Sequence, residues 1–429
     1  MGYSVMNRTQ KLEVQSIFKD MKNSGILDYV TAWYKKAAEY MKDTEIEAAF
    51  VSTNSICQGE QVPVLWPELF YKHGIKINFA HQTFKWSNEA RGKAAVYCII
   101  AGFSIKNKNI KKLYQYAAVN GEPVETTAGQ INAYLVDAPT IFIEKRAKPI
   151  CNVPEMTKGS SPTDDGNFLL TQEEKDNLLE HDKSLKDIIR PYTGAREYLH
   201  NIPRYCIWLK DVSPAKYNHS KEIMNRLASI KEFRLKSESP ATYKFAEFPS
   251  LFVEIRQPVT DYIIIPRHSS ENRLYIPIGF LSSEIIAGDA ASFIPDAGLY
   301  EFGVINSAMH MAWMRYVCGR LELRYRYSAS IVYNNFSWPS PGAKQKAAIE
   351  RAAQGVLDAR AMFPESSLAA LYDPLSMPPK LVMAHQKLDK AVEAAYGRSF
   401  DDDGRRVAHL FELYQKLSAR PLRSLLGVF

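Results

Sequence analysis

The chain has 429 residues, which at ordinary domain sizes corresponds to about three domains. Its residues are 46% hydrophobic and 24% charged, a composition typical of packed cores, so a largely disordered protein is excluded. The formal net charge of +7 permits a nucleic-acid partner without requiring one.

The first 150 residues alternate between helical and strand patterns. In chain order the sequence predicts helical segments within residues 10–47, a strand at 48–51, a helix at 59–73, and strands at 75–79 and 93–103. Pro67 is expected to kink or break the second helical region. Helices that alternate with apolar strands are typical of a doubly wound α/β sheet.

The composition changes near residue 150. Residues 152–167 are rich in Pro, Ser, Thr, Gly and Asp, which indicates a loop or linker. Short mixed elements follow and predict an α+β domain with strands at 205–209, 251–255, 262–266 and 274–280. After the segment WPSPG the pattern becomes helical, with helices expected at 343–362, 379–396 and 405–417.

The five cysteines are widely separated and show no C-x-x-C spacing. This pattern predicts neither a disulfide framework nor a zinc ribbon and indicates free thiols in a reducing compartment. The N-terminal residues lack the apolar segment of a secretory signal, and the longest apolar run, residues 94–103, is too short to span a bilayer. We therefore expect a soluble cytoplasmic protein without a membrane partner.

Familiar catalytic and nucleotide-binding motifs are missing from the sequence, which contains no G-x-G-x-x-G, Walker A, H-E-x-x-H or G-x-S-x-G pattern. The nine histidines are scattered. His81 and His310 are interpreted as structural groups, because a metal site needs three or four convergent ligands. No metal site is predicted.

Residues 79–96 interleave aromatic and basic side chains ahead of a predicted strand. Phe84 and Trp86 stand beside Lys85, Arg91 and Lys93. Such a mixture suits stacking on a nucleic-acid base together with contact to phosphates. The alternative is a structural aromatic pair on a loop.

Residues 313–338 form a second segment in which arginines and tyrosines alternate. The alternation from Glu322 to Ser328 has a period of two, so Glu322, Arg324 and Arg326 are expected on one face of a strand. A carboxylate can accept a hydrogen bond from cytosine N4, and arginine can donate to guanine O6 and N7. The alternative is a solvated strand face with internal salt bridges.

At these residues the sequence resembles the MmeI-like enzymes, the type IIL branch of fused type IIG restriction–modification proteins. The resemblance covers nearly the whole chain, in order, and corresponds to the C-terminal half of the family. The stretches that carry it are LDYVTAWYKKAAEYM (27–41), FVSTNSICQGEQVPVLWP (50–67), FAHQTFKWSNEARGKAAV (79–96), YIPIGFLSSEIIAGD (275–289), HMAWMRYVCGRL (310–321), YRYS (325–328), VYNNFSWP (332–339) and MPPKLVMAHQKLDKAVEAAYG (377–397).

The resemblance implies three domains. Residues 1–150 are expected to be the C-terminal part of a class I methyltransferase domain with a Rossmann-like sheet, 165–340 an α+β target-recognition domain, and 341–429 a small helical C-terminal domain. The family transfers a methyl group from S-adenosylmethionine to adenine N6 in double-stranded DNA, on a base flipped out of the duplex.

The sequence departs from the family pattern in two respects. It contains neither the Gly-rich loop that binds S-adenosylmethionine nor the Asn-Pro-Pro-Phe motif that holds the flipped adenine. No catalytic residue is therefore assigned, and the chain is not expected to bind the cofactor well or to methylate DNA by itself. It is interpreted as a fragment or split product whose partner is a missing N-terminal nuclease and methyltransferase half.

The family uses an aromatic residue ahead of a late strand to stack on the extruded base, and the resemblance places Phe84 in this role, with Trp86 as second choice. Contacts to the DNA backbone are assigned to basic side chains near the two recognition segments, namely Lys85, Arg91, Lys93 and Arg320.

The family varies two pairs of positions with the base pair that is recognised. Glu322 and Arg324 correspond to one pair, and Ala290 and Arg326 to the other. A different class of function remains open, a non-enzymatic DNA-binding specificity subunit that acts with a separate catalytic chain. A helical interaction protein without a nucleic-acid role is the third reading.

Overall fold

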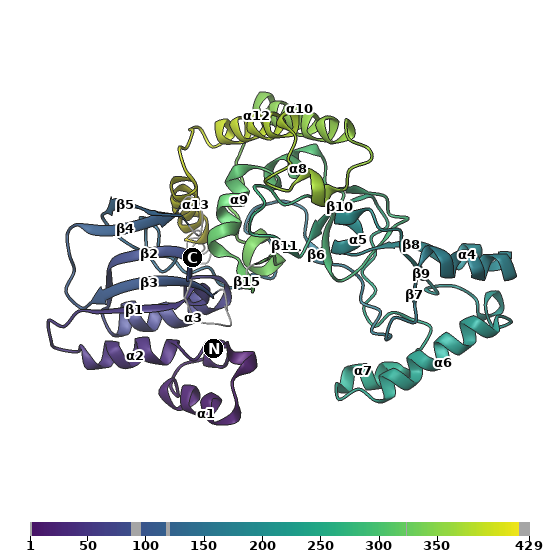
Figure 1. Cartoon of the computed structure of the whole chain (residues 1–429), viewed down its shortest axis with the longest axis horizontal. Helices are drawn as coiled ribbons and strands as arrows, with labels where there is room; N and C mark the ends of the chain where they lie inside the picture. The colour runs from purple at the N-terminus through teal and green to yellow at the C-terminus, as the bar shows by residue number, and fades with distance from the viewer. Residues whose placement is uncertain (1, 87–95, 117–120, 323, 420–429) are drawn as a thin grey trace, which may run out of the picture. The chain divides into compact units, whose positions relative to one another are not determined.

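The computed structural model describes residues 2–86, 96–116, 121–322 and 324–419 (Figure 1). The chain forms two compact units, each assembled from separate stretches of sequence. The first unit comprises Met1–Asn152, Ala308–Pro339 and Arg398–Phe429, and the second comprises Val153–Ser307 and Ser340–Gly397.

The first unit is built on a five-stranded sheet in the order β1-β3-β2-β4-β5. Its strands are β1 (Ala48–Thr53), β2 (Lys76–Trp86), β3 (Val96–Ser104), β4 (Lys111–Tyr116) and β5 (Pro123–Ala128). Strand β3 pairs antiparallel with both β1 and β2, β2 pairs parallel with β4, and β4 pairs antiparallel with β5. Strands β1, β2 and β4 therefore run in one direction, and β3 and β5 run in the other.

The predicted α/β class is confirmed, but the sheet is not the parallel one that the alternating pattern indicated. Parallel neighbours need a crossover of about a dozen residues or more, usually a helix. Only the stretch between β1 and β2, residues 54–75, is that long, and it contains helix α3 (Val62–Pro67). The stretches 87–95, 105–110 and 117–122 are shorter, and the strand direction reverses across each of them.

Helices cover the sheet of the first unit. Tyr34, from α2 (Thr31–Tyr40), stacks on Phe103 with ring centroids 5.4 Å apart and meets Phe50 edge-on at 5.2 Å. Pro67 ends α3, and the chain continues as a π-helical turn, so the predicted break is confirmed. The other helical elements of this unit are η1 (Tyr3–Val5), α1 (Arg8–Ile17), η2 (Ser24–Ile26), η3 (Asn54–Cys57), η4 (Gly59–Gln61), η5 (Glu68–Lys72), α9 (Ala308–Val317), η9 (Ala329–Tyr333) and α13 (Asp403–Ser418).

Distant segments of sequence complete the first unit. Helix α9 packs against α13, where the rings of Trp313 and Phe411 lie 5.6 Å apart. Phe411 also contacts Tyr134 at 5.1 Å. A short hairpin of β15 (Gly319–Leu321) and β16 (Arg324–Arg326) follows α9.

The second unit contains two small sheets, β12-β10-β14-β6 and β13-β8-β9-β7. Its strands are β6 (Thr157–Lys158), β7 (Leu169–Leu170), β8 (Ile189–Thr193), β9 (Tyr205–Ile207), β10 (Tyr262–Pro266), β11 (His268–Ser269), β12 (Gly279–Leu281), β13 (Ile286–Ala287) and β14 (Ala291–Pro295). The strand predicted at 262–266 is confirmed as β10, which is fully buried.

The strand predicted at 251–255 is wrong, because this segment makes only one isolated bridge, between Glu254 and Ser161. The buried side chain of Arg234 explains the difference, since its Nη2 donates a hydrogen bond of 2.8 Å to the carbonyl oxygen of Leu251. The backbone there is used to satisfy a guanidinium group and not to extend a sheet.

The helical elements of the second unit are α4 (Gln172–His181), η6 (Lys183–Ile188), α5 (Ala195–His200), η7 (Pro214–Lys216), α6 (Lys221–Leu235), α7 (Pro240–Lys244), η8 (Phe245–Glu247), α8 (Leu299–Ile305), α10 (Ala343–Ala361), α11 (Leu368–Leu371) and α12 (Pro379–Ala395). Helix α10 packs against both α12 and α8. The C-terminal helices predicted from periodicity are confirmed as α10, α12 and α13. Among the helices in the described ranges, none has the length and apolar character needed to cross a bilayer.

Candidate nucleic-acid interface

Aromatic side chains gather at one edge of the five-stranded sheet. Strands β1, β2 and β4 share a direction, so their carboxyl ends meet at this edge, the place where open α/β sheets bind ligands. Phe84 and Trp86 lie at the end of β2 and Tyr116 at the end of β4. The ring of Phe84 stacks on Tyr116 at 5.4 Å and lies 6.2 Å from Trp86. We call Phe84, Trp86 and Tyr116 the aromatic edge.

His81 supports the aromatic edge from within the sheet. Its Nδ1 shares a hydrogen bond of 2.8 Å with the hydroxyl of Tyr116, and its ring stacks on Tyr114 at 4.1 Å. Burial lowers the pKa of the His81 imidazole, so the ring is neutral at pH 7. His81 therefore fixes the ring of Tyr116, on which Phe84 rests.

The aromatic edge keeps part of its surface open. Phe84 is half-buried, while Trp86 remains 44% exposed at the end of the strand. Lys85, between them, is exposed. Arg91 and Lys93, which were predicted to contact phosphates, lie outside the described residues. Phe84 and Trp86 stand on a strand and not on the loop that the structural alternative assumed.

The β15–β16 hairpin holds the predicted base-reading residues. Tyr325 is buried in the middle of β16, while its neighbours Arg324 and Arg326 are exposed. The predicted period of two is therefore confirmed for these two arginines, whose side chains share the exposed face of β16.

Glu322 departs from the predicted strand. It follows β15 with a φ of 56°, in the left-handed region that tight hairpin turns require. The prediction that Glu322 belongs to the strand is wrong, because the chain reverses there. Its carboxylate still accepts a hydrogen bond of 3.0 Å from Nη2 of Arg324. Both side chains are exposed, so this pair contributes little stability.

Arg320 lies on the opposite strand of the hairpin. Its guanidinium carbon is 3.9 Å from the centre of the Tyr325 ring, and Nη2 donates to the carbonyl oxygen of Arg315 at 3.4 Å. These contacts fix the side chain against the hairpin. Its contact with the DNA backbone stays a prediction.

Ala290 belongs to the second unit, whereas Arg326 belongs to the first. Ala290 is exposed and lies between β13 and β14, where its carbonyl oxygen accepts a hydrogen bond of 3.2 Å from the backbone N–H of Arg267. The joint role of Ala290 and Arg326 in reading one base pair stays a prediction.

Two polar residues to which the sequence reasoning assigned no chemistry follow β1. Asn54 is buried, and its Nδ2 reaches Thr83 Oγ1, next to Phe84, at 3.4 Å. Gln58 is only 9% exposed, and its Oε1 accepts no hydrogen bond from the described part of the chain. Only the pairing of strands brings Asn54 beside Thr83, so no local sequence signal could have found this contact.

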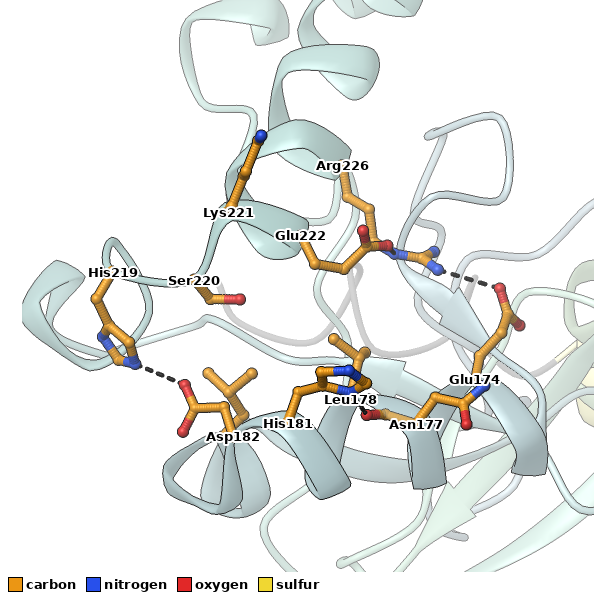
Figure 2. Close-up of a pocket in the computed structure, with 11 residues that line it drawn as sticks. Glu174, Asn177, Leu178, His181, Asp182, His219, Ser220, Lys221, Glu222 and Arg226 are labelled. Carbon is orange, nitrogen blue, oxygen red and sulfur yellow. Dashed lines mark hydrogen bonds and ion pairs between the residues drawn. The ribbon is translucent and has the colours of Figure 1, made fainter.

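A cavity of about 560 Å³ in the second unit is a second candidate site (Figure 2). It lies between α4 and the start of α6, and five of its charged or titratable groups form ion pairs with one another. Arg226 binds Glu174 at 3.1 Å and Glu222 at 2.9 Å, while His219 binds Asp182 at 2.7 Å (Figure 2). The charges of these groups are therefore satisfied within the wall of the cavity.

The same cavity borders a Ser–His–Asp group that does not form a catalytic triad. The hydroxyl of Ser184 donates to Asp182 at 2.6 Å, and Nε2 of His219 faces both residues. In a triad the serine donates to one imidazole nitrogen and the carboxylate holds the other. The described residues also contain no group of three or more His, Cys, Asp or Glu side chains that could hold a metal ion.

Comparison with known proteins defines the class to which this chain belongs. Residues 1–115 match the DNA-methyltransferase domain of MmeI, 137–340 its target recognition domain, and 342–421 its C-terminal domain. The chain therefore belongs to the MmeI family.

Two relatives illustrate the relationship. The chain is 38% identical to DNA methyltransferase A of Bacillus subtilis (strain 168) over 98% of its own length and 47% of that protein. It is 47% identical to the type IIL restriction–modification enzyme MmeI, solved in complex with DNA, with a TM-score of 0.89 over 98% of this chain and 56% of that one. The chain thus spans about half the length of these relatives.

A DNA methyltransferase needs a methyl donor, S-adenosylmethionine. The segment that follows β1 is a 3-10 turn, Asn54–Cys57, in which Asn54, Ile56 and Cys57 are buried. It is not a glycine-rich loop whose backbone N–H groups could approach a cofactor. Within the described residues after β1, Asn54–Cys57 therefore provides no cradle for the cofactor, and we derive no step through it.

Proposed function

We propose that this chain supplies sequence-specific recognition of double-stranded DNA, and part of the target-base pocket, in a S-adenosylmethionine-dependent adenine-N6 methyltransferase of a restriction–modification system. One observation carries the proposal. Arg324 and Arg326 flank the buried Tyr325 in β16, and their side chains share the exposed face of that strand. The hairpin thereby presents two guanidinium groups on one face of a strand, from which they can reach base edges.

The hairpin reads bases through directional hydrogen bonds. An arginine donates to O6 and N7 of guanine, and a glutamate accepts from N4 of cytosine. Glu322 and Arg324 already lie within hydrogen-bonding distance of each other, at 3.0 Å, so they can address the two bases of one pair. Each good bidentate contact is worth about 1–3 kcal/mol of discrimination.

The aromatic edge receives the extruded base. Phe84 and Trp86 offer ring faces for stacking, and stacking of one base on an aromatic side chain is worth about 1–3 kcal/mol. Lys85 lies beside them in the sequence. The DNA backbone is contacted by Lys85, Arg91, Lys93 and Arg320. The sequence contains no Asn-Pro-Pro-Phe motif, whose Asn side chain and Pro carbonyl oxygen would position the adenine amino nitrogen for attack. The chain therefore binds and orients the base, and a separate partner supplies the chemistry.

We assign the three domains to residues 1–150, 165–340 and 341–429, with the first and last contributing to the pocket and its support. The missing N-terminal half, which carries the Gly-rich loop and the Asn-Pro-Pro-Phe motif in the family, completes the enzyme, in the cytoplasm. The absence of a fitting cofactor loop after β1 equally favours a non-enzymatic specificity subunit.

A DNA-binding titration with a pool of randomised duplexes tests the proposal. The bound fraction is sequenced at two salt concentrations. We expect one short enriched motif and a steep loss of affinity with salt, because neutralised phosphates release counterions. Salt-sensitive binding without a motif would contradict base reading, and salt-insensitive binding would favour a protein-interaction role.

A methylation assay distinguishes part of a methyltransferase from a non-enzymatic specificity subunit. We expect no transfer from S-adenosylmethionine to duplex DNA by the chain alone, and transfer once a chain carrying Asn-Pro-Pro-Phe is added. Turnover by the purified chain alone would overturn the assignment of chemistry to a partner. Binding without turnover in any combination would leave the specificity subunit as the function.

A further inference from the structure

Two glycines bring the segment after β1 and the β15–β16 hairpin into backbone contact. Gly59 begins η4 with a φ of 62°, and Gly319 begins β15. A Cβ atom added to Gly59 would lie 2.9 Å from the Cα and 3.2 Å from the backbone nitrogen of Gly319. Atoms this close must move apart, so a side chain at Gly59 is incompatible with the present position of the hairpin.

The contact is anchored on both sides. Cys57 and Gln58, which precede Gly59, are buried, and so is Cys318, which precedes Gly319. The backbone N–H of Cys318 donates to the carbonyl oxygen of Met314 at 3.0 Å, which ties β15 to the end of α9. Neither side of the contact can therefore yield as a loose surface loop would.

The two segments in contact lead to the two halves of the proposed DNA site. Asn54, five residues before Gly59, reaches Thr83 beside the aromatic edge. Gly319 pairs with Arg326 in the hairpin register, and Leu321 with Arg324. The Gly59–Gly319 contact thus connects the segment beside the aromatic edge with the hairpin that carries Arg324 and Arg326.

We propose that the Gly59–Gly319 contact is a specificity-determining joint that sets the distance between the base-reading hairpin and the aromatic edge. The inference rests on the proposed function. Gly59 is the positioning residue, because the backbone of Gly319 can approach it only while it has no side chain, and it touches no base itself. Displacing the hairpin by a few tenths of an ångström weakens directional hydrogen bonds to base edges, whereas contacts to phosphates tolerate such a shift.

Three alanine variants test the joint. Gly59→Ala adds both backbone strain and the contact with Gly319. Gly74→Ala is the matched control, since Gly74 has a φ of 70° but nothing lies within 4 Å of an added Cβ. Gly319→Ala is a second control, because its Cβ would meet only Gly59 Cα, at an ordinary distance of 4.0 Å.

The first readout is selection from the randomised duplex pool. We expect Gly59→Ala to lose enrichment of the motif by about tenfold, the worth of one bidentate contact, with the salt dependence retained. Gly74→Ala and Gly319→Ala should keep the enrichment of the wild type. Equal selectivity in Gly59→Ala and Gly74→Ala would overturn the specificity role.

The second readout is hydrogen exchange of the hairpin amides without DNA, which does not depend on the proposed function. We expect faster exchange in β15 and β16 for Gly59→Ala than for Gly74→Ala. Identical exchange would overturn the joint, whatever the DNA result. A wild-type chain that selects no motif would overturn the proposed function and the specificity role together, while a difference in exchange would still support the positioning of the hairpin.

Discussion

A histidine that stacks on one tyrosine and hydrogen-bonds to a second tyrosine occurs twice in this molecule, and we call this group a constellation. One constellation lies at a surface and the other in a core. In the first unit, His81 stacks on Tyr114 at 4.1 Å and shares a hydrogen bond of 2.8 Å with Tyr116. In the second unit, His385 stacks on Tyr275 at 3.9 Å and shares a hydrogen bond of 2.8 Å with Tyr372.

The surroundings separate the two constellations. His385 and Tyr372 are buried, and Arg360 closes the group by donating to the Tyr372 hydroxyl at 2.7 Å and to the carbonyl oxygen of Ile278 at 2.6 Å. The group at His81 is half-buried, and its aromatic neighbour Trp86 is 44% exposed. The comparison teaches that stacked rings and a hydrogen bond do not themselves indicate a binding site, because the same arrangement is closed off in a core in the second unit.

The largest expected effect comes from removing the group that closes the buried constellation. Arg360→Ala leaves the Ile278 carbonyl oxygen without its donor and opens space over Tyr372, so we expect a loss of about 3 kcal/mol in the free energy of unfolding. Arg351→Ala, at an exposed position of the same helix α10, should change it by less than about 0.5 kcal/mol. Urea titrations of both variants measure the difference, and equal effects would mean that Arg360 has no special structural role.

Removing one hydroxyl from each constellation sharpens the comparison. Tyr372→Phe deprives both Arg360 and His385 of a buried partner and should cost about 2 kcal/mol of stability. Tyr116→Phe removes a half-buried hydrogen bond to His81 and should cost about 1 kcal/mol. Only Tyr116→Phe should reduce the fluorescence change of 2-aminopurine in a bound target duplex. A larger loss of stability in Tyr116→Phe would reverse the assignment of core and surface.

The buried histidines predict a stability that falls in acid. Burial, reinforced by Arg360, holds the pKa of His385 well below its usual range, and burial lowers the pKa of His310 to about 3. Both are neutral in the folded chain, whereas the unfolded chain takes up protons below about pH 6.5. Their stabilising effect is complete above that pH and is lost as the pH falls, by at most about 1.4 kcal/mol per pH unit for each histidine.

His385→Gln should flatten this dependence between about pH 6.5 and pH 5, and His200→Gln, at an exposed position, should leave it unchanged. Urea titrations across that range measure the slope. An unchanged slope in His385→Gln would show that His385 becomes protonated without unfolding.

The smallest effect on stability is expected at the hairpin. Replacing Glu322 and Arg324 together by Gln removes an exposed ion pair, so the free energy of unfolding should change by less than about 0.5 kcal/mol. Selection from the duplex pool should nevertheless change base preference at one position only. A uniform loss of affinity across all sequences would identify the two residues as backbone contacts.

Local sequence patterns predicted the elements whose cause is local. Strand β10, the end of α3 at Pro67 and the helices α10, α12 and α13 follow from apolar periodicity and from proline chemistry. The mixed direction of the sheet was also within reach, since the lengths of the connections decide it. The pattern around Glu322 failed because a period of two cannot distinguish a continuous strand from two strands joined by a turn.

Other features depend on residues that are distant in sequence. The use of the Leu251 carbonyl oxygen by Arg234, the contact of Asn54 with Thr83, and the approach of Gly59 to Gly319 exist only in the folded chain. Each is a contact between atoms that are close in space but far apart in the sequence, and such a contact leaves no periodic pattern in the sequence. The family resemblance assigned the recognition segments, and this assignment stays a prediction, but it did not indicate which contacts hold these segments in place.

The interleaving of the two units sets the order in which the molecule can be made. The rings of Trp313 and Tyr134 in the first unit lie against Phe411 of α13, at 5.6 Å and 5.1 Å. A ribosome therefore delivers the sheet, then the hairpin, and only much later the helix that completes their shared core. Until residues 403–418 have been synthesised, Trp313 lacks its contacts with Phe411 and Tyr414, and an incomplete core of this kind favours association with other chains. The core beside the β15–β16 hairpin is thus completed only after residues 340–397, which belong to the second unit, have been translated.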